Sequence, residues 1–365
     1  MAGVYVSYPF CAQKCTYCNF ASGVLPRELE RRYVDALCLE TLRHAWRWTP
    51  ETVYLGGGTP SQMDPAALGR VLASIPGVPW REATIEASPG TITLEKALAW
   101  CAAGIDRVSL GVQSFNTREL KRTGRKHTAD TVARDVAALR TAGILNLSLD
   151  LIAGLPGQTM DTWNESLEWI ERLGPPHVSL YMLEIDEDSR LGQEVLLNGK
   201  RYGAPDVPAD ALIVEMYERG VDALRGMGLP RYEISNFARP SFESLHNLKY
   251  WQLAPYAGFG ADAHSFDGVV RSQNVEAAVE YVERVEHGER PLAGSVPANS
   301  SEERFFVGLR LAQGICPLPE EWSMFEAPIA RFVASGMLTR EGGRLRLTDR
   351  GVLFSNEVFE EFVGA

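Results

Sequence analysis

The sequence has few cysteines, no long apolar run and no excess of basic residues, and each absence excludes a class of protein. With only six cysteines in 365 residues, it is not a disulfide-stabilised secreted domain. No run of about 18 apolar residues occurs, and the first residues lack the charged and apolar regions of a signal peptide. The net charge of −11 argues against nucleic acid as a partner, because phosphate binding needs clustered Lys and Arg. We expect a cytoplasmic protein with no transmembrane segment and no nucleic-acid partner.

Three of the six cysteines lie close together near the N-terminus. Cys11, Cys15 and Cys18 fall within eight residues, directly after the apolar run Val4–Val6 that predicts a short strand. A structural zinc site needs a fourth Cys or His nearby, but position 20 is not a cysteine and no histidine precedes His44. A cubane iron–sulfur cluster is normally held by four thiolates, so three leave one iron free for a ligand from outside the protein. This pattern favours an open [4Fe-4S] cluster over a zinc site or unrelated reduced cysteines.

The other three cysteines are far apart in the sequence. Cys38, Cys101 and Cys316 lie in helical or apolar surroundings. Because a free cysteine usually behaves as a small buried hydrophobic residue, we expect all three in the core.

Helical and strand patterns alternate from the N-terminus to about residue 182. The expected strands are Val4–Val6, Thr52–Leu55, Ala83–Ala87, Arg107–Val112, Leu145–Ile152 and His177–Met182. The expected helices between them are Leu29–Trp48, Ala66–Ser74, Leu94–Ala103, Ala129–Ala142 and Thr162–Leu173. This succession predicts an α/β fold with a parallel sheet. Six units are too few for a closed eight-stranded barrel, so we expect a partial (βα)6 TIM-like barrel with its reactive groups at the C-terminal ends of the strands.

The remaining sequence divides the chain into three expected parts. Residues 1–230 form the partial barrel, and 231–297 form a connecting segment, in which residues 231–275 are irregular or short-stranded. Residues 298–365 form a smaller, mostly helical, winged-helix-like domain with the hairpin Leu338–Leu347 and a final helix over Asp349–Phe362. Its acidic surroundings argue against DNA binding, so we expect it to pack over the barrel.

A glycine-rich loop follows the second expected strand. Gly57, Gly58 and Thr59 lie in the run Gly56–Pro60, where residues without Cβ let a ligand reach the backbone N–H and C=O groups. A plain strand-to-helix turn is the alternative. Since such a turn rarely needs three successive glycines, we expect a binding loop.

Polar residues also end or interrupt three apolar strands. Glu86, Gln113 and Asp150 occupy these positions, and burial of an unpaired polar group costs about 1–3 kcal/mol. Each side chain therefore needs a polar partner, which is either a ligand or another residue of the barrel core.

The CxxxCxxC set after a first strand resembles the signature of the radical SAM superfamily. Further stretches resemble the branch that contains oxygen-independent coproporphyrinogen III oxidase and the shorter heme chaperone HemW. These stretches are Tyr8–Phe20, Ser109–Phe115, Asp150–Thr159 and His246–Trp251. The resemblance covers nearly the whole chain.

The resemblance implies S-adenosylmethionine (SAM) as the fourth ligand of a cluster held by the three cysteines. Gly57, Gly58 and Thr59 then contact the methionyl amino group of SAM. Glu86, Gln113 and Asp150 correspond to ribose or sulfonium contacts. By the same resemblance Arg125 holds the SAM carboxylate, while Tyr5 and Tyr17 shield the cluster or stack on adenine.

Two differences favour the chaperone over the oxidase within this branch. The oxidase has a further cysteine two residues after the third cluster cysteine, where this sequence has Phe20. It also has an extension before the first strand, which is expected here at Val4.

The segment His246–Trp251 matches the HNxxYW motif associated with heme in HemW. His246 offers an imidazole for heme iron, and Tyr250 and Trp251 offer flat faces to a macrocycle. The alternative is an aromatic core segment in which His246 hydrogen-bonds within the protein. His264 is a second candidate heme ligand.

These inferences predict a heme chaperone that binds heme and a SAM-ligated [4Fe-4S] cluster and delivers heme to an acceptor hemoprotein, such as a respiratory, membrane-associated one. The alternatives are a coproporphyrinogen III oxidase of porphyrin metabolism and a radical SAM enzyme with an unrelated substrate. Whether SAM is cleaved stays open.

Overall fold

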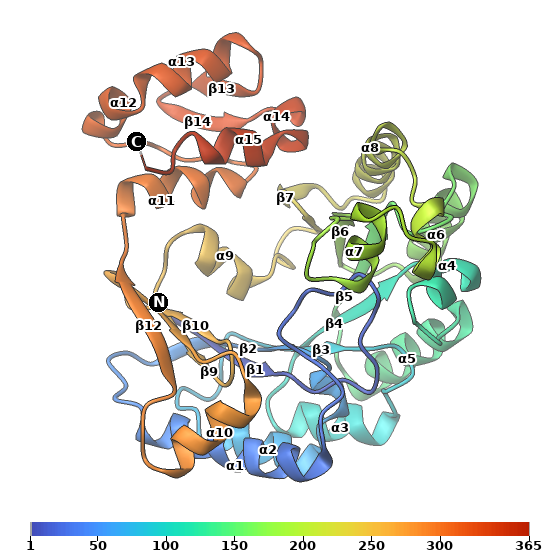
Figure 1. Cartoon of the computed structure of the whole chain (residues 1–365), viewed down its shortest axis with the longest axis vertical. Helices are drawn as coiled ribbons and strands as arrows, with labels where there is room; N and C mark the ends of the chain where they lie inside the picture. Colours follow the sequence, from blue (N-terminus) through green and yellow to red (C-terminus); the bar gives the residue numbers. More distant parts are fainter. Residues whose placement is uncertain (1, 365) are drawn as a thin grey trace.

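The computed structural model describes residues 2–364 (Figure 1). The strands are β1 (Ala2–Tyr8), β2 (Pro50–Gly57), β3 (Glu82–Ala87), β4 (Arg107–Gln113), β5 (Asn146–Ala153), β6 (His177–Met182), β7 (Arg231–Glu233), β8 (Asn236–Ala238), β9 (Tyr256–Phe259), β10 (His264–Phe266), β11 (Val270–Asn274), β12 (Leu292–Pro297), β13 (Leu338–Glu341) and β14 (Arg344–Leu347). The helices are α1 (Arg27–Arg43), α2 (Pro65–Ala73), α3 (Leu94–Ala102), α4 (Thr117–Arg122), α5 (Ala129–Ala142), α6 (Met160–Leu173), α7 (Arg190–Leu196), α8 (Asp210–Gly226), α9 (Leu245–Trp251), α10 (Ala278–Glu286), α11 (Ser300–Phe306), α12 (Pro319–Met324), α13 (Glu326–Ala334), α14 (Asp349–Leu353) and α15 (Ser355–Glu360). Short 3-10 turns cover η1 (Pro60–Gln62), η2 (Arg201–Asp206) and η3 (Gly308–Arg310).

The six strands expected from the sequence form one parallel array. β1 to β6 lie side by side in chain order, and each is parallel to the next. The full sheet has 12 strands, in the order β12-β11-β10-β9-β1-β2-β3-β4-β5-β6-β8-β7. Within residues 2–364 its two edge strands do not pair with each other, so the sheet is open. The predicted α/β fold with an open, partial barrel is confirmed.

The two faces of this sheet differ in polarity because side chains alternate along each strand. On β1, Val4 and Val6 are fully buried in the apolar core, whereas Tyr5 and Ser7 point to the opposite face. Figure 1 shows α1, α2 and α3 along one side of the sheet and α9 on the other. The helix-covered face is therefore the apolar core, and the inner face carries polar side chains.

The segment from 231 to 297 contains short strands, as expected for residues 231–275, and these strands join the main sheet. β8 pairs with β6, and β9 lies parallel to β1, so this segment extends the sheet at both ends. Its strands span as few as three residues. Runs this short do not give a recognisable alternation of polar and apolar residues.

The C-terminal part confirms the expected hairpin but not the final helix. β13 and β14 pair antiparallel around Gly342 and Gly343, as predicted. The prediction of one helix from 349 to 362 is wrong, because the chain leaves helical geometry at Phe354 and separates α14 from α15. After this break Phe362 packs on Phe305, with ring centroids 4.7 Å apart.

The helices of residues 2–364 are all too short or too polar to cross a lipid bilayer.

Replacement of a buried leucine should measure how strongly the core supports this sheet. Leu55 on β2 is 0% exposed, so Leu55→Ala should lower the free energy of unfolding by about 2–5 kcal/mol through lost contacts and a cavity. Leu42→Ala is the matched control on α1, where the side chain is 68% exposed, and should change it by less than about 0.5 kcal/mol. Urea denaturation followed by circular dichroism measures both. Equal effects of the two substitutions would contradict the placement of Leu55 in the core.

Candidate functional site

The three clustered cysteines lie on the loop that follows β1. The amide of Cys11 donates to the carbonyl of Gly23 (2.9 Å), and the amide of Thr16 donates to the carbonyl of Thr123 (3.2 Å). Cys11, Cys15 and Cys18 are half-buried, and their thiols are free. The loop is therefore tied to the protein at two points while its thiols stay within reach of a ligand.

The remaining cysteines lie outside this loop. Cys38 and Cys101 are half-buried, but Cys316 is exposed, so the prediction that it lies in the core is wrong. Cys316 follows β-bridged residue Ile315 in the irregular stretch before α12, where its side chain is exposed.

The glycine-rich loop lies directly against the start of the cysteine loop. The amide of Gly58 donates to the carbonyl of Tyr8 (2.8 Å), and that of Thr59 donates to the carbonyl of Phe10 (2.9 Å). A Cβ at Gly58 would lie 2.7 Å from the carbonyl oxygen of Phe10, which is closer than such contacts allow. Gly57 has φ +108°, a left-handed conformation that favours glycine. The glycines thus bring two backbone segments together at the C-terminal ends of β1 and β2.

Glu86 lies beside this loop at the end of β3. Its carboxylate accepts hydrogen bonds from the Tyr54 hydroxyl (2.8 Å) and from the amide of Gly57 (3.2 Å). Burial raises the pKa of Glu86 to about 7, and the nearby charge of Asp150 adds to this rise. Glu86 is therefore poised between its neutral and ionised forms near neutral pH.

Asp150 on β5 is held by serine hydroxyls. Ser109 and Ser148 each donate to its carboxylate, with distances of 3.1 Å to Oδ1. Burial raises the pKa of Asp150 above its ordinary value, although these hydrogen bonds oppose the shift. Asp150 therefore has hydrogen-bond partners within the barrel core, which is one of the two alternatives expected from the sequence. A ligand that contacts Asp150 would share its carboxylate with Ser109 and Ser148.

Gln113 ends β4 in an unusual backbone conformation. Its φ is +69°, and the pairing of β4 with β5 shifts register between Gly111 and Gln113. Left-handed non-glycine residues and bulges are common next to binding sites, where they redirect a side chain.

Arg125 reaches back to the cysteine loop. Its guanidinium donates to the Tyr17 hydroxyl (3.1 Å) and to the carbonyl of Gly111. Burial opposes a charged guanidinium, but the neighbouring Tyr17 and Cys15 raise the pKa of Arg125 above its ordinary value. The predicted contacts Tyr17 and Arg125 thus lie together beside Cys15.

His246 lies on α9, near the N-terminal ends of β1 and β2 and away from the cysteine loop. The side chain is 1% exposed. Its Nδ1 lies 2.9 Å from the Thr52 hydroxyl, and its Nε2 lies 2.8 Å from the Tyr250 hydroxyl. Burial lowers the pKa of His246 to about 3, so the ring is neutral. Both ring nitrogens are engaged, as in the alternative of a core histidine, whereas His264 on β10 is exposed.

The sequence reasoning missed Tyr54, which connects several of these residues. Its ring stacks between Tyr5 and His246, and its hydroxyl binds Glu86. The available signal was the alternation of polar and apolar residues along β2. Thr52 and Tyr54 lie on one face of the strand, whereas Val53 and Leu55 lie on the other face, toward the core.

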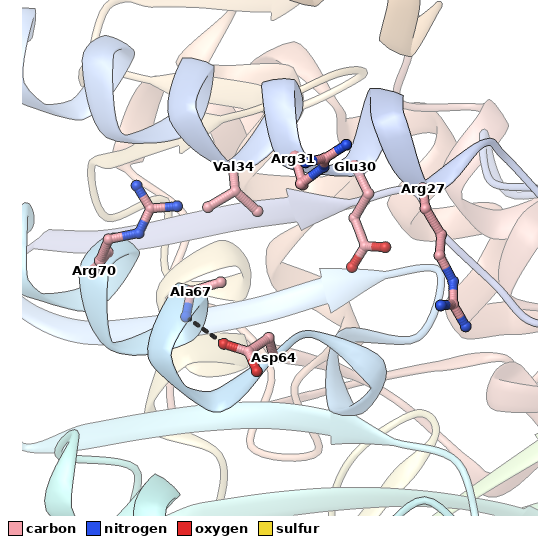
Figure 2. Close-up of a pocket in the computed structure, with 7 residues that line it drawn as sticks. All are labelled: Arg27, Glu30, Arg31, Val34, Asp64, Ala67 and Arg70. Atoms are coloured by element: carbon pink, nitrogen blue, oxygen red, sulfur yellow. Dashed lines mark hydrogen bonds between the residues drawn. The ribbon is translucent and has the colours of Figure 1, made fainter.

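A separate hollow lies on the helix-covered side of the molecule. It has a volume of about 340 Å³ and lies between α1 and the start of α2, as Figure 2 shows. Its lining includes Arg27, Glu30, Arg31, Asp64 and Arg70. Since α1 and α2 cover the opposite face of the sheet from α9, this hollow is not part of the cysteine and glycine-loop site.

Two known families match separate parts of the chain. Residues 5–170 match the radical SAM superfamily, and residues 297–354 match the HemN C-terminal domain. Heme chaperone HemW of Lactococcus lactis is 33% identical over 374 residues, which cover 98% of this chain and 96% of that protein. Heme chaperone HemW of Bacillus subtilis is 30% identical, with 100% of both chains covered.

The chain belongs to the HemW family of radical SAM proteins. The structure of coproporphyrinogen III oxidase (HemN) from Escherichia coli, described as a radical SAM enzyme, has a similar fold, with a TM-score of 0.85 and 20% identity over 100% of this chain and 90% of that one. The resemblance stated from the sequence motifs is therefore confirmed at the level of family and fold.

Membership of the radical SAM superfamily implies a [4Fe-4S] cluster and SAM. The donor set of this HemW-family chain fits them, because three free thiols lie on one anchored loop beside the half-buried glycine loop. Among residues 2–364, no three His, Cys, Asp or Glu side chains converge as ligands of a single metal ion. A cubane has a different requirement, since each thiolate binds a separate iron. Which residues hold the cluster and SAM stays a prediction.

The pKa of Glu86 predicts a pH-dependent contribution to stability. The folded protein binds a proton at Glu86 more tightly than the unfolded chain does, so this contribution is lost as pH rises from about 4.5 to about 7. Glu86→Gln removes the titrating group. The free energy of unfolding, wild type minus variant, should therefore fall by up to about 1.4 kcal/mol per pH unit in this range and then level off. Urea denaturation of both proteins without cofactors checks this, and a difference independent of pH would contradict it.

Proposed function

We propose that this HemW-family chain is a cytoplasmic heme chaperone. It binds SAM at a [4Fe-4S] cluster, binds heme, and delivers the heme to an acceptor hemoprotein, such as a respiratory, membrane-associated one. The observation that carries this proposal is the full-length similarity to proteins named heme chaperone HemW, which extends over 98–100% of this chain.

The loop geometry supports the cluster part of the proposal. Cys11, Cys15 and Cys18 would hold the cluster by their thiolates. When bound, the cluster supplies an electron-transfer centre with one open coordination position for the amino and carboxylate groups of SAM. The proposal does not require SAM to be cleaved.

The residues around this loop have the chemistry that SAM needs. Gly57, Gly58 and Thr59 offer backbone groups to the methionyl amino end. Arg125 is charged and already faces the cysteine loop, so it can hold a carboxylate. Tyr5 and Tyr17 would shield the cluster or stack on adenine.

Acidic and amide side chains complete the proposed SAM contacts. Glu86, Gln113 and Asp150 end or interrupt neighbouring strands and would contact the ribose or the sulfonium. An ionised Glu86 or Asp150 would compensate the positive charge of the sulfonium. Burial raises the pKa of both carboxyl groups, so their ionisation costs free energy that the sulfonium would offset.

For heme, we propose His246 as the iron ligand, with Tyr250 and Trp251 against the macrocycle. Iron binds the neutral imidazole, and burial already favours that form of His246. Ligation requires the ring to give up one of its two hydrogen bonds, with the hydroxyl of Thr52 or of Tyr250. Heme binding at this motif therefore needs a rearrangement of α9.

The alternative function is oxygen-independent coproporphyrinogen III oxidase. The fold that this chain shares with HemN is the observation that favours this alternative. Phe20, which is 65% exposed, argues against it, because the oxidase has a cysteine at this position of the motif. We therefore expect no oxidative decarboxylation of coproporphyrinogen III.

Cys15→Ser should lose the cluster but keep the fold. Serine is a poorer ligand for iron than thiolate, and the loop is anchored through Cys11 and Thr16 backbone groups that the substitution leaves intact. Iron and sulfide are counted after anaerobic reconstitution, and circular dichroism checks the fold. Cys316→Ser is the matched control, since its thiol is exposed and distant in sequence, and should keep the wild-type iron content. Wild-type iron content in Cys15→Ser would reject this ligand assignment.

Heme binding and oxidase activity separate the two candidate functions. The purified protein, titrated with heme, should give a Soret band that saturates at a defined stoichiometry and decreases when an apo-hemoprotein acceptor is added. His246→Ala should weaken this binding about tenfold or more, whereas His264→Ala should not.

Anaerobic incubation of reconstituted protein with coproporphyrinogen III, SAM and a reductant should yield no protoporphyrinogen. Catalytic formation of protoporphyrinogen would replace the chaperone proposal by the oxidase.

A further inference from the structure

Three rings form a stack on the inner face of the sheet, between β1, β2 and α9. The Tyr54 ring lies between Tyr5, with centroids 6.1 Å apart and an interplanar angle of 21°, and His246, at 5.3 Å and 28°. A Cβ at Gly3 would lie 3.0 Å from His246 Cε1, and one at Gly56 would lie 3.0 Å from Tyr54 Cε1. The three rings are therefore tightly confined, and Tyr54 lies next to both Tyr5 and His246.

The hydroxyl of Tyr54 connects this stack to the glycine-rich loop. It donates to Glu86 Oε1 at 2.8 Å, while Oε2 of the same carboxylate accepts from the amide of Gly57 at 3.2 Å. The Tyr54 hydroxyl and the Gly57 amide therefore hold the two oxygens of one carboxylate. The position of the Tyr54 ring is thus linked to the backbone at the start of the loop.

The other end of the stack is fixed by the barrel and α9. The ring of His246 lies between the hydroxyls of Thr52 and Tyr250, at 2.9 Å and 2.8 Å from its nitrogens. The backbone amide of His246 also donates to the buried Glu82 (2.9 Å). Since both ring and backbone are anchored, His246 is a rigid support for the face of Tyr54.

We propose that His246 is a positioning residue for the glycine-rich SAM loop and acts on it through Tyr54 and Glu86. Loss of the imidazole opens one face of the Tyr54 ring, and the hydroxyl then no longer holds Glu86 against the amide of Gly57. A residue of the HNxxYW motif is thereby part of the support of the SAM site. The role in SAM binding rests on the proposed function, but the mechanical link between His246 and Gly57 does not.

Hydrogen–deuterium exchange tests this link in the protein without cofactors. Tyr54→Phe keeps the ring and removes the hydroxyl, so exchange in a peptide covering residues 55–60 should become about threefold to tenfold faster, the range expected for one lost hydrogen bond. His246→Ala should have the same effect in the same peptide. Tyr217→Phe is the matched control. It removes a hydroxyl that donates to the carbonyl of Ile234 (2.8 Å), and this hydrogen bond is remote from the loop. Wild-type exchange at 55–60 in a folded His246→Ala variant, or in a folded Tyr54→Phe variant, would overturn the proposal.

SAM affinity of the reconstituted proteins gives the second measurement. Equilibrium dialysis should show about threefold to tenfold weaker SAM binding for Tyr54→Phe and His246→Ala, and unchanged binding for Tyr217→Phe and His264→Ala. Unchanged affinity in both Tyr54→Phe and His246→Ala would overturn the positioning role. Failure of the wild type to bind SAM would instead refute the proposed function, and the exchange experiment would still decide whether His246 supports the loop.

Discussion

The structure depends on the pairing of polar side chains on the inner face of the parallel sheet. Alternation along the strands places Thr52, Glu82, Glu86 and Asp150 on this face, and an unpaired buried polar group would cost about 1–3 kcal/mol. Each has a partner: His246 for Thr52, the start of α9 for Glu82, Tyr54 for Glu86, and two serines for Asp150. These polar side chains are therefore already paired, and a ligand that binds at the C-terminal end of the face has to share their partners.

Helix α9 is held by these side chains from one side and by the C-terminal part from the other. The carboxylate of Glu82 accepts the amides of Leu245 and His246, both at 2.9 Å. On the opposite side the Arg310 guanidinium lies 4.4 Å from the ring centre of Trp251, a cation–π contact. The HNxxYW segment is thus a structural joint between the barrel and the part that matches the HemN C-terminal domain.

Local patterns in the sequence predicted the parallel array and indicated the loops at its C-terminal edge where the candidate site lies, because both follow from short-range periodicity. The strands β1 to β6 and the loops after them are recognisable from apolar runs that end in glycine or polar residues. The partners of His246 could not be predicted this way: Thr52 lies 194 residues away and meets it only after β2 and α9 come together. Alternation along β2 indicated the face on which Tyr54 lies, but nothing near Tyr54 in the sequence indicated that it would bind Glu86.

The two nitrogens of His246 set a constraint between the two proposed ligands. An imidazole that coordinates heme iron must free one of its nitrogens from the hydroxyl of Thr52 or Tyr250, and a ring that moves to do so would leave Tyr54. The same ring cannot support the SAM loop and ligate iron in the position seen here. By thermodynamic linkage, a heme that displaces His246 weakens SAM binding by the same factor by which SAM weakens heme binding. Occupancy of the SAM site would then favour retention of His246 in the stack, and loss of SAM would favour its release toward heme.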